Sequence, residues 1–219
     1  MTKFQKDKYH EARDLPEIKP ILAKWIAVQQ KYSDQLPDEH SWNYSERASV
    51  GFLAAAVWQS GGVALEEWCT EKGAHKDTKR GRCDLFIHRG KHTFNIEAKH
   101  LWMAVTGNQL KKINRIERLL DKAVTEAKRL RCSGGERRLA ILFVAPFYRP
   151  CRHIGIPDQL QTVLKEMYKI GHSAIAWMFA KPNTLKPDPK SNVVQGIVLI
   201  IREVSDNMAK LPKKPRLSG

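Results

Sequence analysis

Residues 81–102 read GRCDLFIHRGKHTFNIEAKHLW, and this stretch decides the fold. Residues 82–88 are mostly apolar and rich in strand formers, residues 88–92 make a polar connection around Gly90, and residues 93–99 alternate polar with apolar. Two strand-forming segments joined by a short connection that contains glycine predict a β-hairpin.

The alternation within this hairpin brings chemically active side chains together. Because successive side chains of a strand point to opposite faces, Glu97 and Lys99 share one face of the second strand. On the first strand the same rule puts Asp84 on one face and Cys83 and Leu85 on the other. If the strands pair so that Asp84 lies on the face of Glu97, two carboxylates and an ammonium converge. Two such acids repel each other unless a positive charge lies between them, and Mg²⁺ with oxygen ligands is a usual solution.

The pattern of Asp84, twelve intervening residues and then Glu97-Ala98-Lys99 resembles the active site of the PD-(D/E)XK, or restriction-endonuclease-like, nuclease superfamily. Cys83 stands where the first proline of that pattern would be. The resemblance implies that Asp84 and Glu97 bind Mg²⁺, with Mn²⁺ as a substitute, and that the Ala98 carbonyl is an extra ligand. It also implies that Lys99 positions or deprotonates the attacking water.

The tripeptide of an acid, any residue and lysine carries little weight alone, because it occurs five times in the chain. Only the copy at 97–99 lies on a predicted strand, with an acid on the strand before it and a long helix after it. The alternative is a solvated hairpin face with an ordinary salt bridge, worth about 0–1 kcal/mol.

A third acid is expected on the helix predicted at residues 44–60, where Glu46 begins an apolar stripe at helical spacing. In the resembled superfamily a glutamate from this helix completes the metal site, and Glu46 matches that place. Two alternatives stay open. Asn43 as N-cap with Glu46 three residues later would form a capping box that needs no metal. Glu67, near the end of the strand predicted at 63–69, could supply the third acid instead.

A net charge of +15 from 38 Lys and Arg against 23 Asp and Glu favours a polyanionic partner. Nucleic acid is the commonest such partner, and we expect DNA rather than RNA. Residues 70–82 are predicted to form a basic loop, and residues 107–132 a helix with a basic outer face. The resemblance implies that the first turn of this helix, at Gln109 and Lys111, lies nearest the site. The residues expected to contact phosphates, against the alternative that they are merely solvated, are Lys79, Arg80, Arg82, Lys111, Lys112 and Arg115.

The remaining elements complete an α/β fold in which a mixed sheet is flanked by helices. The order helix, strand, strand, strand, helix, strand over residues 44–148 is that of the resembled restriction-endonuclease-like core. One domain over residues 1–204 is expected, followed by a basic, disordered tail at 205–219. Outside the core we predict a polar frayed or helical start at 1–15, a helix at 16–32, a helix at 157–170, and strands at 173–180 and 193–204; within it, 138–148 is the central strand.

Composition limits the other possibilities. No apolar run approaches the roughly 20 residues that span a bilayer, so no membrane association is expected. The first residues lack the apolar segment of a secretory signal, and the four cysteines form no C-x-x-C pair, which together predict a cytoplasmic protein with reduced thiols. The function predicted is a Mg²⁺-dependent nuclease, active as a monomer or as a homodimer. The alternatives are a non-catalytic nucleic-acid-binding module of the same fold and a basic interaction protein of a larger complex.

Overall fold

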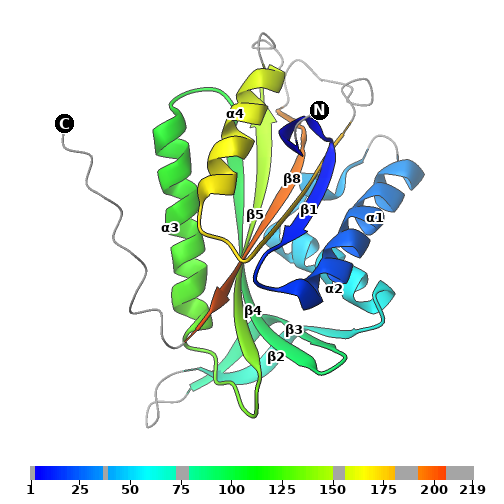
Figure 1. The fold of residues 1–219 in the computed structure, drawn as a ribbon, viewed down its shortest axis with the longest axis vertical. Coiled ribbons are helices and arrows are strands. Elements are labelled where there is room, and N and C mark those ends of the chain that lie inside the picture. The colour runs from blue at the N-terminus through cyan, green and yellow to red at the C-terminus, as the bar shows by residue number, and fades with distance from the viewer. Residues whose placement is uncertain (1–2, 37–38, 73–78, 150–155, 181–191, 206–219) are drawn as a thin grey trace, which may run out of the picture.

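In the computed structural model the chain forms three layers, with one mixed sheet between two layers of helices (Figure 1). The structure describes residues 3–36, 39–72, 79–149, 156–180 and 192–205. The helices and strands are β1 (Lys8–Ala12), α1 (Lys19–Gln35), α2 (Glu46–Gln59), β2 (Val63–Lys72), β3 (Lys79–Arg89), β4 (His92–Ala104), α3 (Gln109–Ala127), β5 (Arg137–Tyr148), α4 (Ile156–Lys169), β6 (Ala174–Phe179), β7 (Val193–Val194) and β8 (Gly196–Val204).

The strand order in the eight-stranded sheet is β1-β6-β8-β5-β4-β3-β2, and the short β7 pairs with β5. β4 and β5 are parallel and are joined through α3, while the other pairs are antiparallel. The helices α1 and α2 pack on one face of the sheet, and α3 and α4 pack on the other (Figure 1). The prediction of an α/β fold with a mixed sheet flanked by helices is therefore confirmed.

The predicted order of elements is also present, as α2, β2, β3, β4, α3 and β5, and α4, β6 and β8 follow as expected. The prediction for residues 1–15 is wrong, because Lys8–Ala12 forms the edge strand β1. Tyr9 of β1 lies opposite Trp177 of β6, and their rings stack with centroids 4.4 Å apart. Residues 8–12 read KYHEA and do not alternate polar with apolar, so no local pattern indicates this strand, and it depends on its partner in the sheet.

β5 is the central strand that the apolar run 138–148 predicts. Leu139, Ile141 and Phe143 are buried on the side of α1 and α2, while Ala140 and Leu142 are buried on the side of α3 and α4. Each fully buried Leu, Ile or Phe side chain contributes about 1.5–3 kcal/mol through removal of apolar surface from water. β5 therefore provides a rigid support for β4, which pairs with it from Phe94 to Ala104.

The helix predicted at 107–132 is α3, and its buried stripe is formed by Ile116, Leu120, Ala123 and Ala127. Asn108 caps its start by accepting a hydrogen bond from the Lys111 backbone N–H at 3.0 Å. In the first turn the structure departs from the helical spacing of apolar residues, which predicts Leu110 on the core stripe: Leu110 is 69% exposed, whereas Lys112 is buried. The Lys112 stem covers apolar surface and its ammonium donates to the Val105 carbonyl, so the side chain is not part of the outer face.

Among the described residues, no helix is both long enough and apolar enough to span a membrane. The predicted tail at 205–219 lies, apart from its first residue, outside the described residues.

Candidate active site

β3 and β4 separate in the middle of the sheet. Their ladder runs from the pair Arg89–His92 to the pair Leu85–Ile96 and ends there. Beyond this point β3 stays paired with β2, while β4 stays paired with β5. We call the place where the two strands part the fork, defined by Asp84 on β3 and residues 97–99 on β4.

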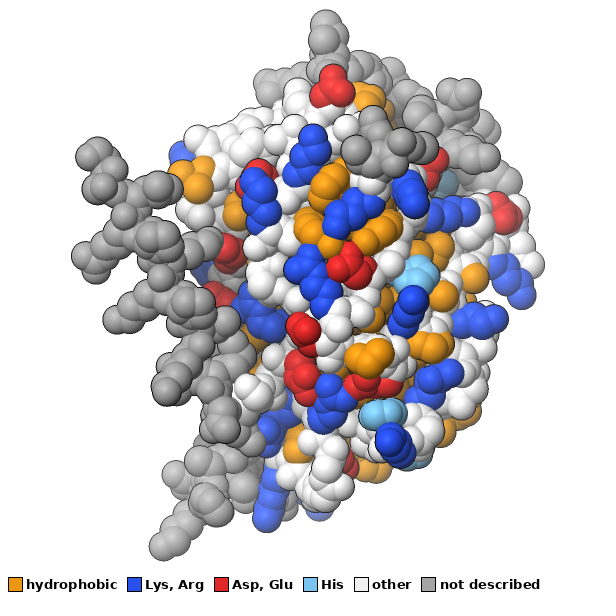
Figure 2. All heavy atoms as spheres, in the orientation of Figure 1, with side chains coloured by type: hydrophobic (Ala, Val, Ile, Leu, Met, Phe, Trp, Pro, Cys, Tyr) orange, Lys and Arg blue, Asp and Glu red, His pale blue; other side chains and the backbone are white. Residues whose placement is uncertain are grey.

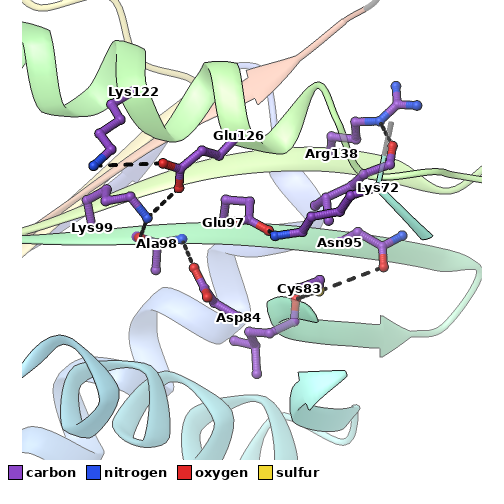
Figure 3. Close-up of polar contacts among 12 residues, drawn as sticks. Lys72, Cys83, Asp84, Asn95, Glu97, Ala98, Lys99, Lys122, Glu126 and Arg138 are labelled. Carbon is purple, nitrogen blue, oxygen red and sulfur yellow. Dashed lines mark hydrogen bonds and ion pairs between the residues drawn. The ribbon is translucent and has the colours of Figure 1, made fainter. Parts of the chain in front are cut away.

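Asp84 closes the fork through its side chain. Its Oδ2 accepts a hydrogen bond of 2.7 Å from the backbone N–H of Ala98 (Figure 3). Ala98 is 1% exposed, so no water could replace this acceptor without a rearrangement. The carboxylate thus stands where the carbonyl of a paired strand would otherwise be.

The backbone on the β3 side of the fork does not alternate as predicted. Cys83 is buried among residues on the side of α3 and α4, but Leu85 is buried on the side of α1 and α2. Glu67 of β2, opposite Asp84, has a φ of +53° and interrupts the pairing. The left-handed region costs a residue other than glycine about 1–2 kcal/mol. The hairpin of β2 and β3 therefore twists at Glu67 and Asp84, and the twist turns Asp84 toward β4.

Glu97 is 2% exposed and lies on the side of β4 that faces α3, as does Lys99. The Lys72 ammonium lies 2.6 Å from Glu97 Oε1, an ion pair rather than a well-directed hydrogen bond. Burial raises the pKa of Glu97; the Lys72 ammonium opposes this rise and the negative charge of Asp84 adds to it. Glu97 is thus a buried acid that depends on a nearby positive charge.

Lys99 is held by two oxygen atoms. Its Nζ lies 2.7 Å from Glu126 Oε2 of α3 and donates a hydrogen bond of 2.7 Å to the Ala98 carbonyl (Figure 3). Burial favours the neutral amine, but the hydrogen bond and charge of Glu126, with the charges of Glu46 and Asp84, outweigh it and raise the pKa of Lys99. Lys99 therefore carries its positive charge at neutral pH, which suits it to orienting or stabilising negative groups and not to removing a proton.

Glu46 is the first residue of α2, with Ser45 as the N-cap residue. The capping-box alternative is wrong, because Asn43 belongs to a separate 3₁₀ turn and Glu46 is the first helical residue, two positions before the one that a capping box requires. Glu46 lines a small cavity of about 50 Å³ together with Asp84 and Glu67, so both candidates for the third acid lie beside the fork.

Asp84 and Lys99 act electrostatically on both Glu46 and Glu97. Burial raises the pKa of Glu46, the positive charge of Lys99 opposes the rise, and the negative charge of Asp84 adds to it. The expectation that Asp84 and Glu97 share one face is wrong. Asp84 approaches from the side of α2, whereas Glu97 and Lys99 lie on the side of α3, and only the separation of β3 from β4 allows them to act on one another.

The donor set suits a hard cation, since Mg²⁺ prefers carboxylate and carbonyl oxygens. Glu46, Asp84 and Glu97 offer carboxylates, and Ala98 offers a carbonyl. Within the described ranges, however, no three His, Cys, Asp or Glu side chains are arranged closely enough to hold a metal ion. The ammonium groups of Lys72 and Lys99 instead contact Glu97 Oε1 and the Ala98 carbonyl. The chemistry of the oxygens fits Mg²⁺, and binding would require these contacts to rearrange.

The predicted basic loop at 70–82 is largely strand, since β2 extends to Lys72 and β3 begins at Lys79. Residues 73–78 and the Lys79 side chain lie outside the described parts. Arg80 and Arg82 are exposed on β3, and Arg82 lies 3.5 Å from Glu67. Both arginines remain available to an external anion on the same hairpin as Asp84.

The basic residues at the start of α3 lie far from the fork. Lys99 contacts Glu126 near the C-terminal end of α3, and Arg115 is eleven residues earlier, about 16 Å along a helix at 1.5 Å per residue. The expectation that Gln109 and Lys111 lie nearest the site is therefore wrong. β4 continues for five residues past Lys99, so α3 starts at the distant end of the strand. On the face formed by α3 and α4, Lys and Arg side chains are scattered among acidic and apolar ones (Figure 2).

Two residues at the site were missed by sequence reasoning. Lys72 falls in the stretch predicted as a basic loop, with no signal that singles it out. Glu126 belongs to one of the five acid-any residue-lysine tripeptides, and its helical setting gave reason to discount it. Only the pairing of distant elements reveals that Lys72 neutralises Glu97 and that Glu126 neutralises Lys99.

Comparisons of the chain with models of known protein families, with curated proteins and with solved structures find no match in any of the three.

Proposed function

We propose that this protein is a metal-dependent nuclease of the restriction-endonuclease-like type, which hydrolyses phosphodiester bonds and prefers DNA to RNA. The observation that carries the proposal is the fork, where Asp84 lines a cavity with Glu46 and accepts a hydrogen bond from the backbone of Ala98. The charges of Asp84 and Lys99 act there on both Glu46 and Glu97. The order of elements from α2 to β5, which is that of the resembled superfamily, supports it further.

In this proposal Asp84, Glu97 and the Ala98 carbonyl hold Mg²⁺ or Mn²⁺, with Glu46 as the third acid. The bound cation would neutralise charge on the scissile phosphate and favour ionisation of the attacking water. Lys99, kept charged by Glu126, orients that water and stabilises the negative charge that develops on the phosphate. Arg80 and Arg82 contact the backbone of the nucleic acid without reading its sequence.

The test is cleavage of plasmid and of single-stranded DNA in Mg²⁺, in Mn²⁺ and in EDTA. Lys99→Ala is the test variant, and Lys122→Ala is its matched control. Lys122 lies 3.9 Å from the same Glu126 but makes no contact with the fork. We expect metal-dependent cleavage that Lys99→Ala abolishes and Lys122→Ala retains. Equal cleavage by all three proteins, or no cleavage by the wild type, contradicts the proposal.

A second function is favoured by the ion pairs at the fork. Lys72 and Lys99 already neutralise the acids without a cation, which suits a nucleic-acid-binding module that does not cleave. Such a module would bind DNA with a steep dependence on salt, and binding would survive Asp84→Asn. Binding of this kind without cleavage in Mg²⁺ or Mn²⁺ would favour the module over the enzyme.

A further inference from the structure

Lys72 reaches the fork from the edge of the sheet. It is the last residue of β2, which pairs with β3 alone, whereas its partner Glu97 lies on β4. Its side chain therefore crosses over β3 to place the ammonium 2.6 Å from Glu97 Oε1 (Figure 3). A lysine at the edge of a sheet would ordinarily extend its charge into water.

Gly81 makes this crossing possible. A Cβ at Gly81 would lie 2.7 Å from Cδ, 2.8 Å from Cγ and 3.3 Å from Cβ of Lys72. The first two distances are shorter than side chains tolerate, so the Lys72 stem occupies the space that a side chain at position 81 would take. The three atoms nearest to that Cβ position all belong to Lys72. The absence of a side chain at Gly81 therefore allows the Lys72 stem to cross the strand.

The backbone of Lys72 is held as well. It forms an isolated β-bridge with Leu130, which is buried just after the end of α3. The backbone of Lys72 is thus fixed on one side by Leu130, and its stem is fixed on the other side by Gly81. Because its backbone and its side-chain stem are both held, Lys72 has a defined position beside Glu97.

We propose that the Lys72 ammonium and the divalent cation are alternative counterions of Glu97. In the absence of cation Lys72 neutralises this buried carboxylate; when the cation binds, the ammonium leaves Glu97 and faces the phosphate of the substrate. This inference rests on the proposed function, since it takes Glu97 as a cation ligand. Loss of the Lys72 charge then has two opposite effects, tighter cation binding and weaker DNA binding.

The test measures Mn²⁺ binding at pH 8 by electron paramagnetic resonance, together with DNA binding at saturating Ca²⁺ by fluorescence anisotropy, because Lys72 faces the phosphate only when a cation occupies Glu97. The variants are Lys72→Met, Gly81→Ala and the control Lys122→Met, which removes an equal charge that contacts Glu126 and not Glu97. We expect Lys72→Met to bind Mn²⁺ about tenfold more tightly, equivalent to about 1.4 kcal/mol, and to bind DNA more weakly. Gly81→Ala keeps the charge but displaces the stem, so it should shift Mn²⁺ binding in the same direction.

The outcomes separate this inference from the proposed function. Suppose that the wild type binds Mn²⁺. If Lys72→Met weakens this binding, or changes it no more than Lys122→Met does, the inference is overturned and the metal site still stands. Absence of Mn²⁺ binding in the wild type and in Lys72→Met overturns both. Circular dichroism and urea unfolding establish that each variant is folded; if Lys72→Met is not, Gly81→Ala decides the question, and unchanged Mn²⁺ binding in it contradicts the inference.

Discussion

Asp84 has a structural task at the fork that can be separated from its proposed catalytic task. Its carboxylate is the acceptor for the Ala98 N–H at 2.7 Å, and Ala98 is almost fully buried. Asp84→Ala leaves that N–H without a partner, which costs about 1–3 kcal/mol. With a urea dependence of about 2 kcal/mol per molar, the unfolding midpoint should fall by about 0.5–1.5 M.

Asp84→Asn is the matched comparison, because an amide oxygen can still accept from Ala98. Exchange of a charged acceptor for a neutral one loses about 1 kcal/mol, and removal of the negative charge relieves repulsion on Glu46 and Glu97. We expect Asp84→Asn to stay within about 1 kcal/mol of the wild type in stability and yet to lose metal-dependent cleavage.

Urea unfolding followed by tryptophan fluorescence, with cleavage measured on the same samples, checks both expectations. Equal stability of Asp84→Ala and Asp84→Asn would refute the reasoning that the side-chain oxygen replaces a ladder carbonyl. Cleavage that survives Asp84→Asn would instead refute the assignment of Asp84 to the metal site. The two variants therefore test the structural and the catalytic statement independently.

Three further changes have definite expected outcomes. Glu67→Gly removes the penalty of a left-handed residue and should raise the free energy of unfolding by up to about 1 kcal/mol; a lower melting temperature would contradict this. Glu126→Gln withdraws the charge that holds Lys99, and should slow cleavage while circular dichroism stays unchanged; an unaltered rate would show that Lys99 does not depend on it. Burial of Glu11 opposes its ionisation, but hydrogen bonds from tyrosine and arginine side chains outweigh this and hold its pKa at about 2. Because this pKa lies below the ordinary value of 4.5, ionised Glu11 stabilises the fold above pH 4.5, and the benefit is lost as the pH falls toward 2. Glu11→Gln should thus flatten the acid side of a stability-pH curve, and a curve that keeps the wild-type slope would contradict it.

The parts of the fold that could be predicted from the sequence are those encoded by local periodicity. The turn at Gly90, with a φ of +61°, joins β3 and β4 as the hairpin pattern predicts. The continuous apolar run of β5 is buried on both faces, and Trp25 lies in the core on an amphipathic helix. Each of these features depends on residues within a few positions of one another.

The geometry of the fork could not be predicted in the same way. A strict period of two places Cys83 and Leu85 on one face, but the twist at Asp84 separates them. That twist coincides with a left-handed glutamate, Glu67, and glutamate has no particular preference for this conformation. Pairing between Lys72 and Glu97 joins two strands that are not neighbours, and no local pattern encodes it.

The fork is a costly feature of the sheet, and this is the strongest physical reason to regard it as functional. Replacement of buried ion pairs by apolar residues is often neutral or stabilising, and the Glu97 side of the Lys72–Glu97 pair is buried. Glu67 adds backbone strain, and Asp84 replaces regular pairing by a single side-chain contact. A sheet shaped by stability alone would continue the ladder of β3 and β4. Departures from local rules are expected where function requires them. Here the three departures lie at the fork or, in the case of Glu67, directly opposite Asp84. Their coincidence supports the nuclease proposal more strongly than the tripeptide at 97–99, of which the chain contains four other copies.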